Sequence, residues 1–129
     1  MISGIYAALA ALLIVGLARN VIRLRRQYKV ALGDGGNGDL LAAIRAHANA
    51  VEYLPIGLLL LLIFELNQGP IWLLHLLGSM FIIGRLIHAY GVSKAIISRR
   101  IIGMQMTLWL LIIMAVLNLF AFAGFQLAS

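Results

Sequence analysis

The sequence predicts an all-α integral membrane protein, a bundle of four transmembrane helices that run alternately up and down. Three observations predict this fold class. The 129 residues are 64% hydrophobic and 11% charged, with a mean hydropathy of +1.05, whereas soluble domains carry about 25% charged residues. The apolar residues form long unbroken runs rather than an alternating pattern, which disfavours a β-barrel. The chain also has room for four helical crossings of about 20 residues each, joined by short connections.

The whole chain, 1–129, is expected to form a single membrane domain. The expected spans are about 2–26, 40–64, 71–96 and 101–128. The first span is uncharged until a basic segment at 19–26. A signal peptide carries its positive charge before the apolar run, so this first segment is expected to remain in the protein. The glycine-rich segment 33–39 predicts a loop with Asp39 as the N-cap of the next helix, and the segment 67–70 predicts a tight turn.

The net charge of +6 reflects basic residues that flank the apolar runs. Because no aromatic-rich polar surface accompanies them, nucleic-acid binding is not expected. Five basic residues follow the first apolar run, three lie between the third and fourth spans, and none lies in the turn between the second and third. Both basic connections are therefore expected in the cytoplasm and both termini outside. The absence of cysteine excludes a disulfide scaffold.

The second expected helix carries three polar residues on one face. Arg45, Asn49 and Glu52 are spaced at i, i+4 and i+7. These side chains can satisfy one another as an internal salt bridge, or they can bind a zwitterion, since ionisable residues inside a span are functional candidates. His47 points away from this face, and a lone histidine in a span is more often a packing residue than a ligand. With no cysteine and no metal-binding histidine spacing, no metal site is expected.

The third expected helix places Arg85, His88 and Val92 on one face. Arg99 returns to the same face if this helix continues far enough. Pairing with Glu52 would neutralise Arg85 inside the bundle. One acid cannot match all the basic groups, so an excess of positive charge is expected on the cytoplasmic side. Either lipid headgroups or a polyanionic small molecule would balance it.

The segment 45–55, Arg-Ala-His-Ala-Asn-Ala-Val-Glu-Tyr-Leu-Pro, resembles the second-helix signature of the MAPEG family, the membrane-associated proteins of eicosanoid and glutathione metabolism. The resemblance extends to the Arg25–Arg26 pair, to the segment 85–91 and to Arg99, and so covers nearly the whole chain. It implies a homotrimer of four-helix subunits. Because this short chain is similar to the small bacterial members of the family, the resemblance also implies a bacterial inner membrane.

The resemblance further implies glutathione as co-substrate, bound at a subunit interface in a pocket open to the cytoplasm. The residues implied as glutathione contacts are Arg25, Arg26, Arg45, His47, Asn49, Glu52, Tyr53, Arg85 and His88. Arginines would bind the two carboxylates of glutathione, and Glu52 would bind its ammonium or hold Arg45 in position. The thiol-activating arginine of the family corresponds to Arg99, with Arg100 as the alternative. It would stabilise the thiolate of a group whose ordinary pKa is about 8.5.

Three functions remain open at this point. The first is conjugation of an apolar electrophile, or reduction of a lipid hydroperoxide, by glutathione. The second is a non-catalytic trimer that binds glutathione or an anionic lipid. Val92 favours the second, because synthases of the family carry a hydroxylated or aromatic side chain at this place. The third is a small four-helix transporter with Glu52 as its membrane-embedded acid, although Arg45 on the same face would neutralise that acid.

Overall fold

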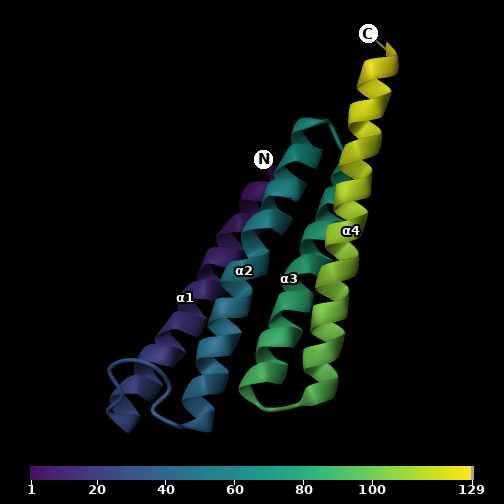
Figure 1. Ribbon diagram of the computed structural model, residues 1–129. Helices are drawn as coiled ribbons and strands as arrows, with labels where there is room; N and C mark the ends of the chain where they lie inside the picture. Colours follow the sequence, from purple (N-terminus) through teal and green to yellow (C-terminus); the bar gives the residue numbers. More distant parts are fainter. Residues whose placement is uncertain (129) are drawn as a thin grey trace.

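The computed structural model of the protein describes residues 1–128, with side chains as far as residue 124. It forms a bundle of long helices joined by short connections (Figure 1). The helices are α1 (Ile2–Tyr28), α2 (Gly38–Leu66), α3 (Ile71–Ser93) and α4 (Ile97–Ala128). All four are long and apolar enough to cross a membrane, which confirms the all-α, four-span prediction. In Figure 1 the α1–α2 loop and the α3–α4 turn lie at the lower end, whereas both termini and the α2–α3 turn lie at the upper end.

The loop between α1 and α2 is shorter than expected, because α1 continues to Tyr28 and α2 begins at Gly38. The N-cap of α2 is Asn37 rather than the expected Asp39. Asn37 has extended backbone angles (φ −92°, ψ 119°), and its side-chain oxygen accepts a hydrogen bond from the amide of Leu40 at 2.9 Å. Asp39 lies inside the helix, where its carboxylate accepts a hydrogen bond from the hydroxyl of Tyr28 at 3.1 Å. Asp39 therefore ties the two helices together rather than starting the second.

The turn between α3 and α4 comprises only residues 94–96, so the third helix is shorter and the fourth starts earlier than expected. Ala95 adopts a left-handed conformation (φ 56°), and the amide of Ile96 donates to the carbonyl of Gly91 at 2.8 Å. This local pairing satisfies the carbonyls at the end of α3 and stops the helix. Arg99 therefore lies near the start of α4, not on an extension of α3.

Two glycines allow α3 and α4 to pack at very short range. A Cβ atom placed on Gly103 would overlap the backbone of His88, and one placed on Gly91 would overlap the backbone of Arg100. Backbone cannot rotate away as a flexible side chain can, so only glycine permits this approach. The contact holds His88 and Arg100 beside each other near the lower end of the bundle.

At the upper end, Glu65 in the last turn of α2 binds the start of α1. Its carboxylate accepts hydrogen bonds from the amides of Ile2 and Ser3 and from the hydroxyl of Ser3. A negative charge at a helix N-terminus is favourable because the unpaired amides point toward it. The hydroxyl of Tyr6 lies 2.9 Å from Nδ1 of His75 on α3. Together these contacts fix α1 to α2 and α3 at the end away from the basic connections.

We expect Gly103→Ala to destabilise the bundle by about 1–3 kcal/mol, because the added methyl group must push α3 away from α4. The midpoint of thermal unfolding in detergent measures this effect. Gly16→Ala on α1 is the matched control, since nothing lies within 4 Å of the added atom and alanine favours a helix by about 0.5–1 kcal/mol. Equal midpoints for the two variants would contradict the close α3–α4 contact.

Candidate functional site

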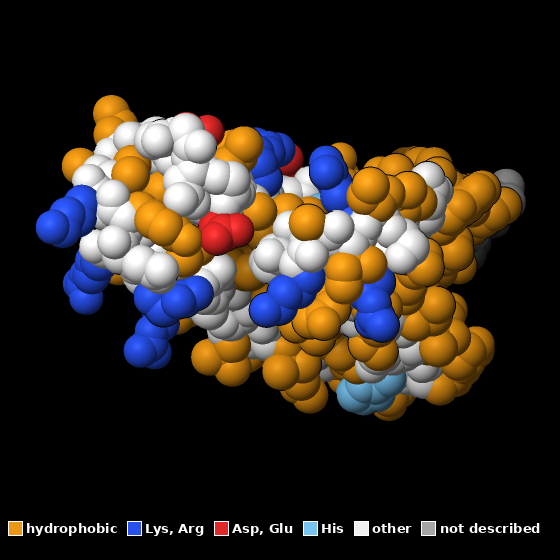
Figure 2. All heavy atoms as spheres, turned by 90° about the horizontal axis from the view of Figure 1, so that it is seen from below, with side chains coloured by type: hydrophobic (Ala, Val, Ile, Leu, Met, Phe, Trp, Pro, Cys, Tyr) orange, Lys and Arg blue, Asp and Glu red, His pale blue; other side chains and the backbone are white. Residues whose placement is uncertain are grey.

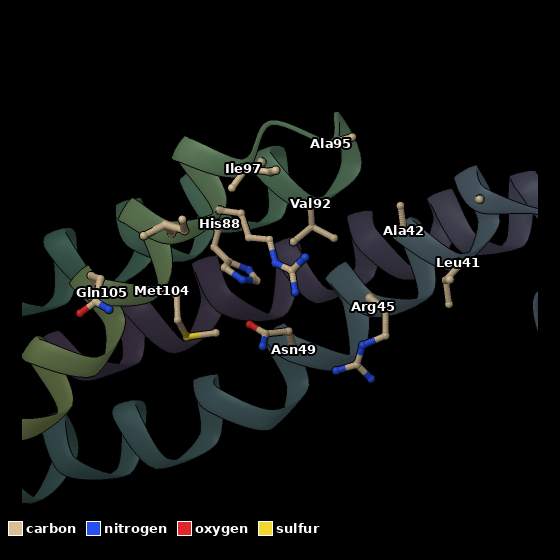
Figure 3. A pocket seen from close by; sticks show the side chains of 14 residues that line it. Leu41, Ala42, Arg45, Asn49, His88, Val92, Ala95, Ile97, Met104 and Gln105 are labelled. Atoms are coloured by element: carbon tan, nitrogen blue, oxygen red, sulfur yellow. The ribbon is translucent and has the colours of Figure 1, made fainter.

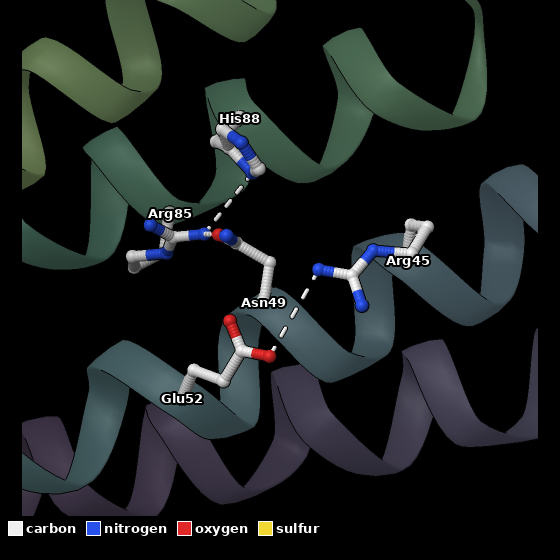
Figure 4. Close-up of polar contacts among 5 residues, drawn as sticks. All are labelled: Arg45, Asn49, Glu52, Arg85 and His88. Atoms are coloured by element: carbon white, nitrogen blue, oxygen red, sulfur yellow. Dashed lines mark hydrogen bonds and ion pairs between the residues drawn. The ribbon is translucent and has the colours of Figure 1, made fainter.

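The most deeply buried charged side chain is that of Arg85 on α3, which is 1% exposed. Its guanidinium donates to Oγ1 of Thr107 on α4 at 3.1 Å, to the side-chain oxygen of Asn49 on α2, and to Nδ1 of His88 at 3.0 Å. The ring of Tyr53 lies 5.5 Å from the guanidinium carbon, a cation–π distance. Figure 4 shows Asn49 and His88 turned toward Arg85. One guanidinium therefore links three of the four helices.

The partner of Arg85 is not Glu52, contrary to the pairing considered from the sequence. Glu52 Oε1 lies 3.9 Å from Nη2 of Arg45, on its own helix, and both side chains are more than half exposed (Figure 4). Asn49 lies between these two residues on α2 and supplies the oxygen that reaches Arg85. The polar face of α2 thus has two parts. The side-chain amide of Asn49 binds the buried Arg85, and the Arg45–Glu52 ion pair remains accessible to solvent.

The hydrogen bonds of Arg85 also determine which groups of Asn49 and His88 remain available to bind a ligand. A guanidinium can only donate hydrogen bonds, so the Asn49 oxygen and His88 Nδ1 both act as acceptors. With Nδ1 accepting, the proton of the His88 ring lies on Nε2. Asn49 likewise keeps its NH2 group for other partners. The Nε2–H group of His88 and the NH2 group of Asn49 are therefore available as donors to a ligand.

A pocket of about 600 Å³ opens beside this cluster, between α2 and the α3–α4 junction. Its charged and polar side chains are Arg45 and Asn49 from α2, His88 from α3, and Arg100 and Gln105 from α4. Figure 3 shows Arg45, Asn49 and His88 around a common space. Leu41, Ile101 and Met104 contribute an apolar wall. The pocket thus combines several donors with a surface suited to an apolar group.

The structure separates the two arginines considered for thiol activation. Arg100 lines the pocket. Arg99 is exposed and lies outside the pocket lining, with its guanidinium carbon 5.4 Å from the ring centroid of Tyr90. Since Arg99 and Arg100 are adjacent on α4, they point in directions about 100° apart. The start of α4 therefore favours Arg100 as the residue that a pocket ligand would meet.

Other candidate residues lie outside this pocket. Arg25 donates to the carbonyl of Gly33 at 2.7 Å in the α1–α2 loop. Arg26 lines a shallow groove on α1. His47 is partly exposed on another face of α2, and Tyr53 contacts Arg85 instead. The structure thus brings together the pocket residues Arg45, Asn49, His88 and Arg100, but not the whole predicted set.

Sequence reasoning missed Thr107, which is fully buried in α4. Its hydroxyl donates to the carbonyl of Gly103 at 2.9 Å and accepts from Arg85. The fourth expected span has no charged residue that would indicate a site. The only signal for Thr107 is that it is a polar side chain within an apolar span. Gln105, which lines the pocket, carried the same weak signal.

We expect Thr107→Val to lower the stability of the bundle by about 1.5–3 kcal/mol, because the buried guanidinium of Arg85 loses an acceptor while the side-chain volume is kept. The midpoint of thermal unfolding in detergent provides the measurement. Ser98→Ala, at an exposed position on the same helix, is expected to change stability by no more than about 0.5 kcal/mol. An unchanged midpoint for Thr107→Val would mean that Thr107 does not support Arg85.

Comparison with known proteins adds family information to this geometry. Residues 3–120 match the model of the MAPEG family. The chain is 44% identical over 119 residues to the inner membrane protein YecN of Escherichia coli K12, which covers 92% of this chain and 91% of that protein. YecN of Escherichia coli O6:H1 gives the same values. The uncharacterized protein sll1147 of Synechocystis sp. PCC 6803 is 32% identical over 97 residues, covering 74% of this chain and 69% of the relative.

Proposed function

The chain belongs to the MAPEG family, and from this premise we propose that it is a trimeric membrane protein that binds glutathione and directs its thiol at an apolar electrophile. Glutathione and the trimer come from the resemblance to the family. The E. coli relative is named as an inner membrane protein, and we propose the same location here. In the proposed orientation the basic connections and the pocket opening face the cytoplasm, where glutathione is present.

The observation that carries this proposal is the cluster of hydrogen-bond donors in the pocket. Arg45 and Arg100 present guanidinium groups from α2 and α4. Asn49 and His88 can add NH donors, since the Asn49 oxygen and His88 Nδ1 accept from Arg85. A site built from donors suits an anion, and two arginines suit a ligand with two carboxylates. Glutathione has that chemistry.

The remaining groups of glutathione match residues near the pocket. Glu52 lies beside Arg45, 3.9 Å away and more than half exposed, and is therefore available to an ammonium group. Arg25, Arg26 and His47 lie outside the pocket of their own subunit, so they would reach glutathione only from a neighbouring subunit. This is one reason that the proposal includes an oligomer. Tyr53 and Arg85 would act indirectly, by holding Asn49 and His88 in place.

We assign stabilisation of the thiolate to Arg100, because it lines the pocket whereas Arg99 does not. Each unit by which a guanidinium lowers the pKa of the thiol requires about 1.4 kcal/mol of interaction. An electrophile dissolved in the bilayer would enter along the apolar wall at Leu41, Ile101 and Met104. The sulfur would then form a bond to carbon while the leaving group departs with its electron pair.

We expect the purified protein to bind glutathione, and Arg45→Ala to weaken this binding about 10-fold or more, as for the loss of a hydrogen bond to a charged group. Isothermal titration calorimetry in detergent measures the affinity. Lys29→Ala removes the same charge from the α1–α2 connection, outside the pocket lining, and should bind as the unaltered protein does. Equal affinities for Arg45→Ala and Lys29→Ala would mean that the ligand lies elsewhere.

Measuring the chemical step distinguishes the roles of the adjacent residues Arg99 and Arg100. We expect Arg100→Ala to reduce conjugation of glutathione to a chromogenic haloarene about 10-fold or more, because a rise of one unit in the thiol pKa lowers the thiolate fraction by that factor. Arg99→Ala should retain most of the activity. The ultraviolet absorbance of the bound thiolate should fall in Arg100→Ala only. The opposite ranking of these variants would transfer the role to Arg99.

A second candidate function is binding without turnover. Val92 lines the pocket at the place where synthases of the family carry a hydroxylated or aromatic side chain. Glutathione binding that depends on Arg45, together with conjugation no faster in the unaltered protein than in Arg100→Ala, would favour this function over catalysis.

A further inference from the structure

The proposed glutathione site gives no role to two arginines of α1, Arg19 and Arg23, which lie beside Arg26. Arg19, Arg23 and Arg26 are spaced at i, i+4 and i+7, and all three are exposed. Together with Asn20 and Ile22 they line a shallow groove, the basic face of α1. The side-chain oxygen of Asn20 accepts a hydrogen bond from Arg23 at 2.8 Å, which restrains that guanidinium. Figure 2, a view of the lower end of the bundle, shows basic side chains gathered there.

The acidic residues of the chain are engaged elsewhere. The sequence has four of them. Asp34 accepts from the amide of Gly36, Asp39 accepts from the hydroxyl of Tyr28, and Glu65 binds the start of α1 at the opposite end. In the part of the chain that the structure describes, the ion pair is that of Glu52 with Arg45. The basic face of α1 thus carries charge without a carboxylate partner among the described residues.

The basic face lies at the depth of a lipid headgroup. A helix rises about 1.5 Å per residue, so Arg19 lies about 26 Å and Arg23 about 32 Å along the axis from Ile2, where α1 begins. The hydrocarbon core of a bilayer is about 30 Å thick, and a headgroup layer of about 5–8 Å follows it. Arg19 and Arg23 therefore bracket the boundary between the hydrocarbon core and the headgroup layer, and flexible arginine side chains extend from there to lipid phosphates.

The same face becomes apolar toward the centre of the membrane. Val15 and Leu12 precede Arg19 by four and seven residues, so they lie on the same side of α1. They are 53% and 69% exposed, and Ile22 between the arginines is 49% exposed. One side of α1 therefore presents an apolar track that ends in two guanidinium groups. An apolar surface that ends in two guanidinium groups is complementary to a phospholipid, whose acyl chain is followed by a phosphate.

We propose that the basic face of α1 is a binding site for an anionic phospholipid of the leaflet at the lower end of the bundle. Arg19 and Arg23 bind the phosphate, since a guanidinium pairs with two phosphate oxygens at once. The acyl chain lies along Val15 and Leu12. The site is separate from the pocket at Arg45 and does not depend on glutathione.

The test measures lipid retained by the purified protein in native mass spectra, after incubation with equal amounts of phosphatidylglycerol and phosphatidylcholine in detergent. The unaltered protein is expected to retain severalfold more phosphatidylglycerol. The Arg19→Gln/Arg23→Gln variant is expected to lose this preference. Lys29→Glu is the matched control: it changes the net charge by the same two units, near the same end of α1, and should keep the preference. Glutathione binding should be unchanged in both variants.

Several outcomes would overturn the proposal. A lack of preference in the unaltered protein, or equal loss of preference in Lys29→Glu, would mean that no defined site exists. Weaker glutathione binding in Arg19→Gln/Arg23→Gln would identify the face as part of the glutathione site, and a smaller assembly mass would identify it as a contact between copies. If the double variant does not fold, Arg19→Gln and Arg23→Gln are compared singly, and retention equal to that of the unaltered protein in both would also reject the site.

Discussion

The burial of one guanidinium constrains more of this structure than any other interaction. Removing a charge from water costs several kcal/mol even after the protein relaxes, and the cost is offset only when hydrogen bonds surround the charge. Arg85 donates these bonds to Asn49 on α2, His88 on α3 and Thr107 on α4. The three helices must therefore keep one relative position near this level. Because the Asn49 oxygen and His88 Nδ1 accept from Arg85, the NH donors of both side chains remain available to the pocket that they line.

The two ends of the bundle differ in how their charged groups are balanced. At the upper end, Glu65 satisfies the amides that begin α1, so charge and backbone neutralise each other within the chain. At the lower end the basic residues greatly outnumber the acids. Arg45, Arg100 and the basic face of α1 consequently need anions that the described residues do not supply. The asymmetry follows the distribution of charge along the sequence, and it directs both proposed ligands to the same side of the membrane.

Much of the fold was predictable because apolar runs of membrane length are a strong signal. The four long helices, the connections at opposite ends and the resemblance to the MAPEG family are confirmed. Helix ends were less predictable, since they depend on local backbone choices. Asn37 replaces Asp39 as the cap of α2, and the left-handed Ala95 ends α3 early.

The polar face of α2 in the site was predictable from the sequence, but the partner of Arg85 was not. Helical spacing placed Arg45 and Glu52 together, and the structure agrees. Spacing alone does not say which residue of α2 faces α3. The contact of Arg85 with Asn49 rather than Glu52 therefore could not be predicted from the sequence. Which of Arg99 and Arg100 lines the pocket likewise could not be decided from spacing alone. A change of one residue on a helix turns a side chain by about 100°.

The position of the pocket relative to the connections has a mechanical consequence. The walls on α2 and α3 are joined by a short turn at the upper end, whereas the pocket opens near the lower end of both helices. α3 has 23 residues, a length of about 35 Å. A tilt of about one degree between the two helices at that turn would displace the far walls by about 0.6 Å, so the turn alone does not define the width of the pocket. The hydrogen bond from Arg85 to Asn49 joins α3 to α2 beside the pocket, so this bond rather than the distant turn sets the separation of the walls.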